Sequence, residues 1–185
     1  HLAWSEHGVL PWRRLVEPAV ALAGDGFPMS DVLARSLADV LPRMADHQAS
    51  VAQFSKRGEP YEAGETFRQP DLALTLTRIA ERGPAGFYEG ETAELIEREM
   101  AANGGLMTRA DLAAYRAVRR RPITGTYRGY DIISMPPISS GGAAVIQMLN
   151  ILEGYDLSAS GAGSAATTHL VIEAMRRAYA DRARY

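Results

Sequence analysis

The chain has 185 residues, of which 46% are hydrophobic and 23% are charged, and its formal net charge at pH 7 is -2. This composition is ordinary for a globular protein, and it excludes the strongly basic surface that binding to nucleic-acid phosphates requires. The absence of cysteine excludes a disulfide framework, a thiolate metal site and a cysteine nucleophile. No apolar run has the length of a membrane span, so we predict no membrane-spanning segment.

The first half of the chain predicts helices separated by turns. A helical pattern follows Pro11, and Pro18 within it predicts a bend or a restart of the helix. Ser30 and Asp71 are candidate N-caps for two further helices. Between these helices, over 49–67, hydrophobic periodicity is lost, and we expect a long exposed loop.

The second half predicts more helices and one strand pair. Thr108 and Asp111 have the spacing of a capping box, with aspartate in place of the usual glutamate, and begin a short helix. The last expected helix carries an apolar stripe and has no stop signal, so we expect the chain to be a piece of a larger protein. The expected segments are helices over 92–100, 142–152 and 164–185 and strands over 118–127 and 130–135.

The turn between the second strand and the next helix is the most informative segment. Two prolines end the strand because proline cannot donate to a sheet ladder, and a serine and glycine run then begins an apolar helix. We interpret this as a structural turn in which a serine caps the helix and the glycines permit close backbone approach. The alternatives are an anion cradle or a nucleophilic serine, although the spacing is not that of a nucleophile elbow. The turn residues are Pro136, Pro137, Ser139, Ser140, Gly141 and Gly142.

Two other patterns resemble ligand sites. The run from Gly161 to Ala166 fits a dinucleotide fingerprint, but no strand precedes it, so we favour a flexible loop with Ser164 as a helix N-cap. His169 and Glu173 lie one helical turn apart, as a metal pair would. The other histidines are scattered along the sequence, so we predict no metal site.

Arg116 and Arg119 to Arg121 form a short basic cluster. We interpret it as a solvated strand edge or as an ion-paired contact with a partner segment, because nucleic-acid patches are longer and include aromatic residues. No Ser/His/Asp set and no close carboxylate pair stands out. The residues alone therefore indicate no active site.

Six blocks of this sequence resemble γ-glutamyltransferases (glutathione hydrolases) and occur in that family's order. The segment MPPISSGG at 135–142 resembles the family's MPPPSSGG, with Ile138 where a third proline is usual, which weakens only the rigidity of the turn. The blocks are LPWRRLVEPAVALAGDGF (10–27), QPDLALTLTRIAERGPAGFYEG (69–90), NGGLMTRADLAAYRAV (103–118), RRPITGTYRGYDIISMPPISSGG (120–142), NILEGYDL (150–157) and EAMRRAYADRARY (173–185).

The resemblance implies an N-terminal-nucleophile hydrolase whose precursor cleaves itself into a large and a small subunit. The new N-terminal threonine of the small subunit attacks the γ-glutamyl bond, with its own amine as base, and the acyl group passes to water, an amino acid or a peptide. This chain resembles the middle and later part of the large subunit. The threonine, the oxyanion-hole glycines and the pocket serines belong to the small subunit, and the carboxylate-binding arginine lies earlier in the large subunit. The resemblance thus assigns no catalytic or substrate-binding residue here and implies no cofactor.

We therefore expect an α+β fold, mostly helical, in which residues 1–185 form a single fragment without a complete catalytic domain. Its strand pair would belong to the αββα sandwich of the full enzyme. The expected partners are the rest of the large subunit, the small subunit and γ-glutamyl small molecules, and the isolated fragment is expected to self-associate. A periplasmic or secreted location follows from the resemblance alone. The alternatives are a cephalosporin or glutaryl acylase of the same plan and a non-catalytic helical interaction domain.

Overall fold

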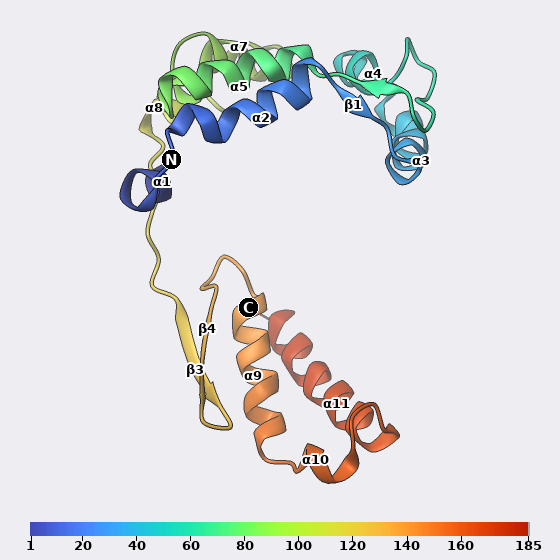
Figure 1. Cartoon of the computed structure of the whole chain (residues 1–185), viewed down its shortest axis with the longest axis vertical. Helices are drawn as coiled ribbons and strands as arrows, with labels where there is room; N and C mark the ends of the chain where they lie inside the picture. The colour runs from blue at the N-terminus through green and yellow to red at the C-terminus, as the bar shows by residue number, and fades with distance from the viewer. Residues whose placement is uncertain (185) are drawn as a thin grey trace. The chain divides into compact units, whose positions relative to one another are not determined.

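The computed structural model describes residues 1–184, which divide into two compact units, His1–Ala117 and the chain from Val118 onward (Figure 1). Tyr185, where the last expected helix ends, lies outside the described residues. Each unit is mostly helical and contains one two-stranded antiparallel sheet. Within the described part of the chain, none of the helices is both long enough and apolar enough to cross a membrane. The expectation of a single fragment without a complete catalytic domain stays a prediction.

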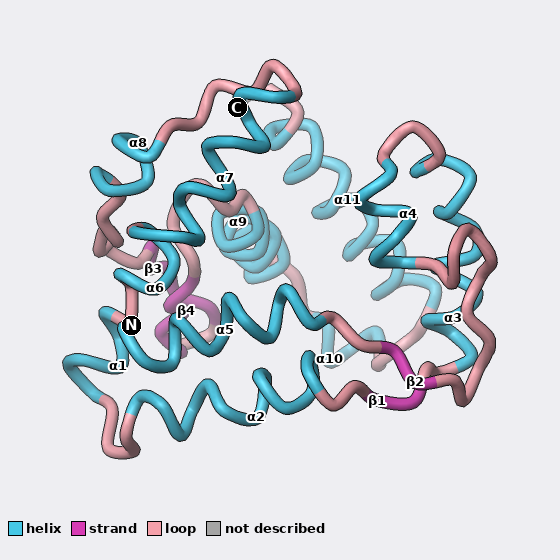
Figure 2. Tube along the Cα trace, turned by 90° about the horizontal axis from the view of Figure 1, so that it is seen from above, coloured by secondary structure: helices cyan, strands magenta, loops and turns pink. Residues whose placement is uncertain are grey.

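Two long helices, α2 (Trp12–Gly24) and α5 (Pro70–Arg82), pack side by side in the first unit (Figures 1 and 2). The indole Nε1 of Trp12 donates a hydrogen bond to the backbone carbonyl of Ile79 at 2.8 Å, so the start of α2 is fixed to the end of α5. Helix α2 continues through Pro18, so the expected restart is wrong. The other helices of this unit are α1 (Leu2–His7), α3 (Asp31–Val40), the 3-10 helix η1 (Leu41–Met44), α4 (Gln48–Phe54), α6 (Ala85–Tyr88), α7 (Gly90–Ala102) and α8 (Arg109–Ala114).

Helix starts in the first unit follow capping chemistry. The Ser30 hydroxyl accepts a hydrogen bond from the Leu33 N–H at 3.1 Å, which confirms the expected cap of α3. The expected cap at Asp71 is wrong, because α5 begins at Pro70 and Asp71 lies in its first turn. Proline suits the first helical position, where its missing N–H would have no helical partner, and a carboxylate there interacts favourably with the helix dipole.

The expected long loop over 49–67 is partly wrong. Helix α4 covers its first residues, and β2 (Thr66–Phe67) at its end pairs antiparallel with β1 (Phe27–Pro28). Phe67 is only 5% exposed, and its ring stacks on that of Phe54 with 6.2 Å between the centroids. Contacts between segments far apart in sequence, rather than local periodicity, organise this region.

In the second unit, helix α9 (Gly141–Glu153) packs against both a β-hairpin and the long helix α11 (Ala165–Arg182) (Figure 1). Strand β3 (Ile123–Tyr127) pairs antiparallel with β4 (Tyr130–Ser134), and the short helix α10 (Leu157–Ser160) precedes α11. The strand pair and both long helices were expected. The first strand begins five residues later than predicted, after Pro122, which has no N–H to donate to a ladder.

Small residues allow the close packing around α9. A Cβ at Gly125 of β3 would lie 2.6 Å from Cγ2 of Ile146, so glycine lets the hairpin approach the helix. On α11, Ala174 and Ala178 are each 1% exposed. The strand pair and α11 thus depend on α9 for their apolar contacts.

The hairpin turn is fixed to the end of α9. Arg128 and Gly129 have φ angles of 49° and 84°, the left-handed pair that a two-residue hairpin of this twist requires. The Arg128 N–H donates to Oε1 of Glu153 at 2.6 Å, and its guanidinium donates to the Tyr155 carbonyl at 2.7 Å. These bonds hold a non-glycine residue in a conformation that such residues seldom adopt.

Candidate functional site

The turn between β4 and α9 is the candidate site that the sequence singled out. The Ser139 N–H donates to the Pro136 carbonyl at 3.2 Å, which closes the turn after the two prolines. The Ser139 hydroxyl accepts from the Gly141 N–H at 3.3 Å, at the first residue of α9. Ser140 occupies the N-cap position but makes no side-chain hydrogen bond to the helix. Ser139 therefore satisfies one of the free N–H groups at the helix start.

The two glycines of the turn have different surroundings. A Cβ at Gly142 would lie 2.3 Å from the Met135 carbonyl oxygen and 2.8 Å from the Ser134 hydroxyl. A Cβ at Gly141 would meet only the Ser139 hydroxyl, at 3.4 Å. Close backbone approach is therefore found at Gly142, and the same expectation for Gly141 is wrong.

A pocket of about 340 Å³ lies beside this turn, between the start of α9 and the end of α11. Gln147 on α9 donates to the Asp181 carboxylate on α11 across its wall. A serine hydroxyl is a weak nucleophile without a neighbouring base. The lining, all of it within the described residues, holds no histidine and no lysine, and its carboxylate, Asp181, accepts the hydrogen bond from Gln147. The lining residues are Pro137, Ile138, Ser139, Ser140, Ala143, Ala144, Gln147, Ala178, Asp181 and Arg182. This geometry supports a structural turn, and that role stays a prediction.

The glycine-rich run before α11 has the loop geometry that we favoured over a dinucleotide site. Helix α10, not a strand, precedes it, and Gly161 and Gly163 have φ angles of 78° and 71°. The Ser164 hydroxyl accepts from the Thr167 N–H at 3.1 Å, which confirms Ser164 as the N-cap of α11. The strand that a dinucleotide fingerprint requires is thus replaced by a helix.

His169 and Glu173 both lie on α11, and the Glu173 carboxylate forms an ion pair with Arg176 at 2.9 Å. Across residues 1–184, no three side chains of the metal-binding kinds gather into one cluster. The spacing along the helix therefore brings together no additional ligand from another element. A pair of ligands alone is fewer than a structural metal site uses.

The arginine cluster lies in irregular chain before β3. Arg116 donates to the carbonyls of Ala113 and Tyr115 at 2.6 and 2.7 Å, and Arg119 to Arg121 are exposed. The interpretation as a strand edge is wrong, because β3 begins only at Ile123.

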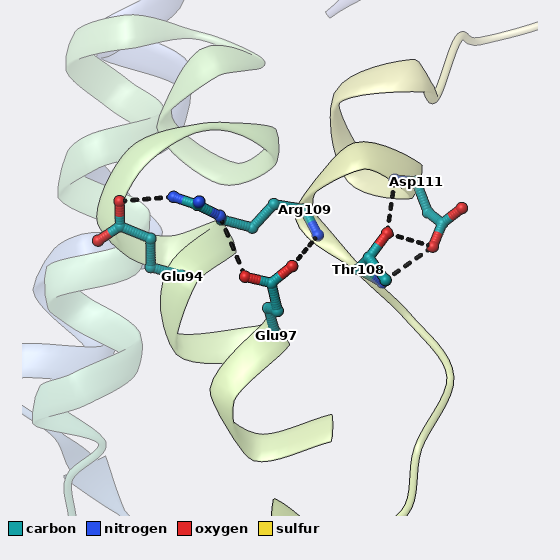
Figure 3. Close-up of polar contacts among 5 residues, drawn as sticks. All are labelled: Glu94, Glu97, Thr108, Arg109 and Asp111. Atoms are coloured by element: carbon teal, nitrogen blue, oxygen red, sulfur yellow. Dashed lines mark hydrogen bonds and ion pairs between the residues drawn. The ribbon is translucent and has the colours of Figure 1, made fainter. Parts of the chain in front are cut away.

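A polar cluster joins α7 and α8, and the sequence predicted only part of it (Figure 3). The expected capping box is confirmed: the Thr108 hydroxyl accepts from the Asp111 N–H, and the Asp111 carboxylate accepts from the Thr108 N–H at 2.9 Å. Hydrogen bonds from the Thr108 hydroxyl and then from its N–H lower the pKa of Asp111. Arg109 also pairs with Glu94 at 3.0 Å and Glu97 at 3.1 Å.

Sequence reasoning missed these Arg109 ion pairs, because their partners lie 12 and 15 residues away and no local spacing marks them. All three side chains are about half exposed, and exposed ion pairs contribute little to stability. The cluster joins the middle of α7 to the start of α8, and its Thr108 hydroxyl serves as the cap of α8. It is a structural contact rather than a reactive site.

Comparison with known proteins places these observations in a family. A family model described as gamma-glutamyltranspeptidase matches residues 1–185. The chain is 50% identical over 188 residues to the glutathione hydrolase proenzyme of Escherichia coli K12, covering 100% of this chain and 32% of that protein. It is 42% identical over 181 residues to the acylase ACY 1 proenzyme of Pseudomonas sp. V22, covering 98% of this chain and 32% of that protein.

Among solved structures, the gamma-glutamyltranspeptidase of Helicobacter pylori superposes with a TM-score of 0.94 at 44% identity, covering 98% of this chain and 52% of that chain. The expected fold class is confirmed: a mostly helical part of an N-terminal-nucleophile hydrolase with a short antiparallel strand pair. The chain spans about a third of the length of the curated relatives it matches.

Proposed function

The chain belongs to the gamma-glutamyltranspeptidase family, and from this membership we propose that the protein containing it cleaves the γ-glutamyl bond of glutathione and related compounds. The acyl group then passes to water, an amino acid or a peptide. The observation that carries this proposal is the 50% identity to a glutathione hydrolase proenzyme along the whole chain. The nucleophile is the N-terminal threonine of a small subunit, whose free amine acts as base.

In this proposal the chain is part of the large subunit and contributes structure rather than chemistry. Relatives named as proenzymes indicate a precursor that is processed into subunits. The partners of this chain are then the rest of the large subunit and the small subunit of the same precursor. The hairpin and helix α9 supply the frame of the β4–α9 turn, which carries no activated nucleophile in the described residues.

An acylase is the second candidate, because the acylase ACY 1 proenzyme is 42% identical over 98% of this chain. The two activities differ in the acyl group: a γ-glutamyl group carries an α-amino group that a glutaryl group lacks. A site that binds this amino group discriminates strongly against the analogue without it, since its buried polar partners are left unpaired.

The deciding experiment compares a γ-glutamyl anilide with the matched glutaryl anilide as substrates of the full-length, matured protein. We expect kcat/KM to favour the γ-glutamyl compound by on the order of 100-fold or more. A preference for the glutaryl compound would establish the acylase alternative. Turnover of neither compound would contradict both and favour a non-catalytic interaction domain.

Ser140→Ala in the same full-length protein tests whether the serine of the β4–α9 turn is structural or catalytic. Because Ser140 forms no side-chain bond to α9, its replacement should leave maturation and turnover of the γ-glutamyl anilide unchanged. A variant that folds and matures normally yet loses nearly all turnover would make this serine catalytic.

We also propose a periplasmic or secreted location, which rests on the family resemblance alone. Fractionation of cells of the source organism, followed by immunoblotting with a cytoplasmic marker as control, tests it. Recovery of the protein only with the cytoplasmic marker would contradict the proposal.

A further inference from the structure

The turn that ends α7 has the sequence Asn103-Gly104-Gly105, in which an asparagine is followed directly by glycine. The amide carbon of an asparagine side chain can be attacked by the backbone nitrogen of the next residue. Glycine hinders this attack least, because it has no Cβ and its backbone turns freely. Gly104 has a φ of 73°, and apart from its chain neighbours no atom lies within 4 Å of the place that a Cβ would take. The backbone around the attacking nitrogen is therefore uncrowded.

The Gly104 nitrogen also stays outside the hydrogen bonds that close this turn. The Asn103 N–H donates to the carbonyls of Glu99 and Met100 at 3.2 and 3.3 Å, and the Gly105 N–H donates to the Met100 carbonyl at 2.7 Å. Within residues 1–184, the Gly104 N–H donates no hydrogen bond. The attacking group therefore has no bond of its own to break before it reacts.

Ring closure does require the Asn103 side chain to leave Glu99. Its amide donates to the Glu99 carbonyl at 3.0 Å and to the Glu99 carboxylate at 2.9 Å. Asn103 is the C-cap residue of α7, and helix ends open at a much lower free-energy cost than helix interiors. The opening that the reaction needs is thus local to this turn.

The chain holds one other asparagine, Asn150, which lacks these features. It lies inside α9 and is followed by Ile151, whose β-branched side chain hinders attack by its own nitrogen. A ring could form there only after α9 opened. Both asparagines are exposed in this chain, so they differ in the following residue and in backbone structure. Asn150 is therefore an internal control.

We propose that Asn103 is a site of spontaneous deamidation. The Gly104 nitrogen forms a bond to Cγ of Asn103, the Cγ–Nδ2 bond breaks, and Nδ2 leaves as ammonia with the proton of the Gly104 nitrogen. Water then opens the resulting succinimide at either carbonyl, which gives aspartate or isoaspartate at position 103. The reacting groups belong to adjacent residues and water is the only other reagent, so the reaction needs no docking surface. The proposal is independent of the γ-glutamyl activity.

The product changes the end of α7. A carboxylate at position 103 cannot donate the two hydrogen bonds that the amide gives to Glu99. It also lies one helical turn after the Glu99 carboxylate, which has the same charge, and at the negative end of the helix dipole. Isoaspartate lengthens the backbone of the turn as well. Deamidation should therefore loosen the last turn of α7.

The test is incubation of the native full-length protein at mildly alkaline pH, followed by peptide mass spectrometry, with a sample digested before incubation as the blank. Acid at position 103 should form at least about 10-fold faster than acid at position 150, because α9 must open first. Gly104→Ala should slow the reaction at Asn103 at least about 10-fold, because the added Cβ hinders the attack. The unfolding temperature of the wild type should fall during incubation, whereas that of Asn103→Ser, which has no amide to lose, should stay constant.

The comparison of the two asparagines needs no variant, so it stands even where Gly104→Ala does not fold. Equal rates at Asn103 and Asn150 would overturn the proposal, as would a rate at Asn103 that Gly104→Ala leaves unchanged. An equal fall in the unfolding temperature of Asn103→Ser would contradict the effect on α7. Deamidation at Asn103 in the unfolded protein but not in the native protein would overturn the proposal too, and would show that the full-length fold holds this turn closed.

Discussion

At the scale of single residues, Gly142 is the position at which the β4–α9 turn tolerates least change. Its missing side chain leaves room for the Met135 carbonyl oxygen, which cannot move without shifting the end of β4. Gly141, one residue earlier, faces mostly open space. Replacing each glycine by alanine therefore separates two effects. At Gly142 the added methyl group clashes with neighbouring backbone, whereas at Gly141 it changes mainly the helix propensity.

Gly142→Ala should destabilise the full-length protein by about 1–3 kcal/mol, the usual cost of forcing extra atoms into close packing. Gly141→Ala should be neutral or stabilise by up to about 1 kcal/mol, because alanine restricts the unfolded chain and favours helix. Thermal unfolding of both variants measures the difference. Equal shifts in the unfolding temperature would contradict the geometry of the turn.

Asp111 links stability to pH through the α8 capping box. Its pKa is lowered because the Thr108 hydroxyl and N–H both bond its carboxylate. A lowered folded pKa means that the native state favours the charged form. The contribution is therefore complete above the ordinary aspartate pKa of about 3.9 and is lost as the pH falls below it through the folded value.

Asp111→Asn should lower the unfolding temperature at neutral pH, and the difference from wild type should shrink as the pH falls below about 4. In that range the wild-type Asp111 carboxyl becomes protonated, so the wild type also loses the stabilisation that the charged carboxylate provides. Asp71→Asn, in the first turn of α5, is the control for a general loss of negative charge at a helix start. A difference for Asp111→Asn that stays constant or grows toward low pH would contradict the account.

At the scale of elements, the β3–β4 hairpin depends on α9. A two-stranded hairpin alone is marginally stable in water. Here its turn residue Arg128 bonds the Glu153 carboxylate through its N–H, and Gly125 lets the sheet approach Ile146. The hairpin turn is therefore hydrogen-bonded to the end of α9, and the strands pack against the middle of α9.

Glu153→Ala should loosen this hairpin, because it leaves the Arg128 N–H without its acceptor, whereas Glu153→Gln keeps an oxygen in the same place. Hydrogen exchange in peptides covering 127–133 of the full-length protein should accelerate in the alanine variant and much less in the glutamine variant. Unchanged exchange in the alanine variant would show that the bond does not hold the turn.

The sequence predicted those elements whose residues follow a regular spacing. Helices α7, α8, α9 and α11 were expected near their observed positions, as were the caps at Ser30 and Ser164. Strands β1 and β2 have two residues each, too few for any alternation to appear. Helix α4 falls in a stretch without periodicity, next to the aromatic contact between Phe54 and Phe67.

The candidate site was predicted as a segment but not in its details. The prolines, serines and glycines marked the turn, yet only the fold shows that Gly142 faces the Met135 carbonyl and that Ser139 bonds the helix start. No sequence pattern predicts the ion pairs of Arg109, because they depend on how α7 and α8 pack against each other. Contacts of this kind depend on the path of the backbone.

At the scale of the whole molecule, the second unit exposes many large apolar side chains. Ile133 and Met135 are 72% and 66% exposed, and on α11 Ile172 and Tyr179 are about half exposed. Exposed apolar side chains that gather into large patches mark interfaces or promote aggregation. In the proposed enzyme they face the remaining parts of the protein.

The isolated 185-residue chain should therefore self-associate, and light scattering should give a mass above the 20.1 kDa of one copy. A hydrophobic dye should bind it more strongly than it binds the full-length protein, which serves as the control. A monodisperse monomer that binds no dye would contradict this view of its surface.

We propose that this chain supports γ-glutamyl transfer in the full-length protein without performing it. The most direct test measures anilide release from a γ-glutamyl anilide by the isolated chain and by the matured full-length protein, at equal molar concentration. We predict turnover by the full-length protein and none above background by the isolated chain, because the proposed nucleophile belongs to the small subunit. Turnover by the isolated chain that survives repurification would contradict the claim.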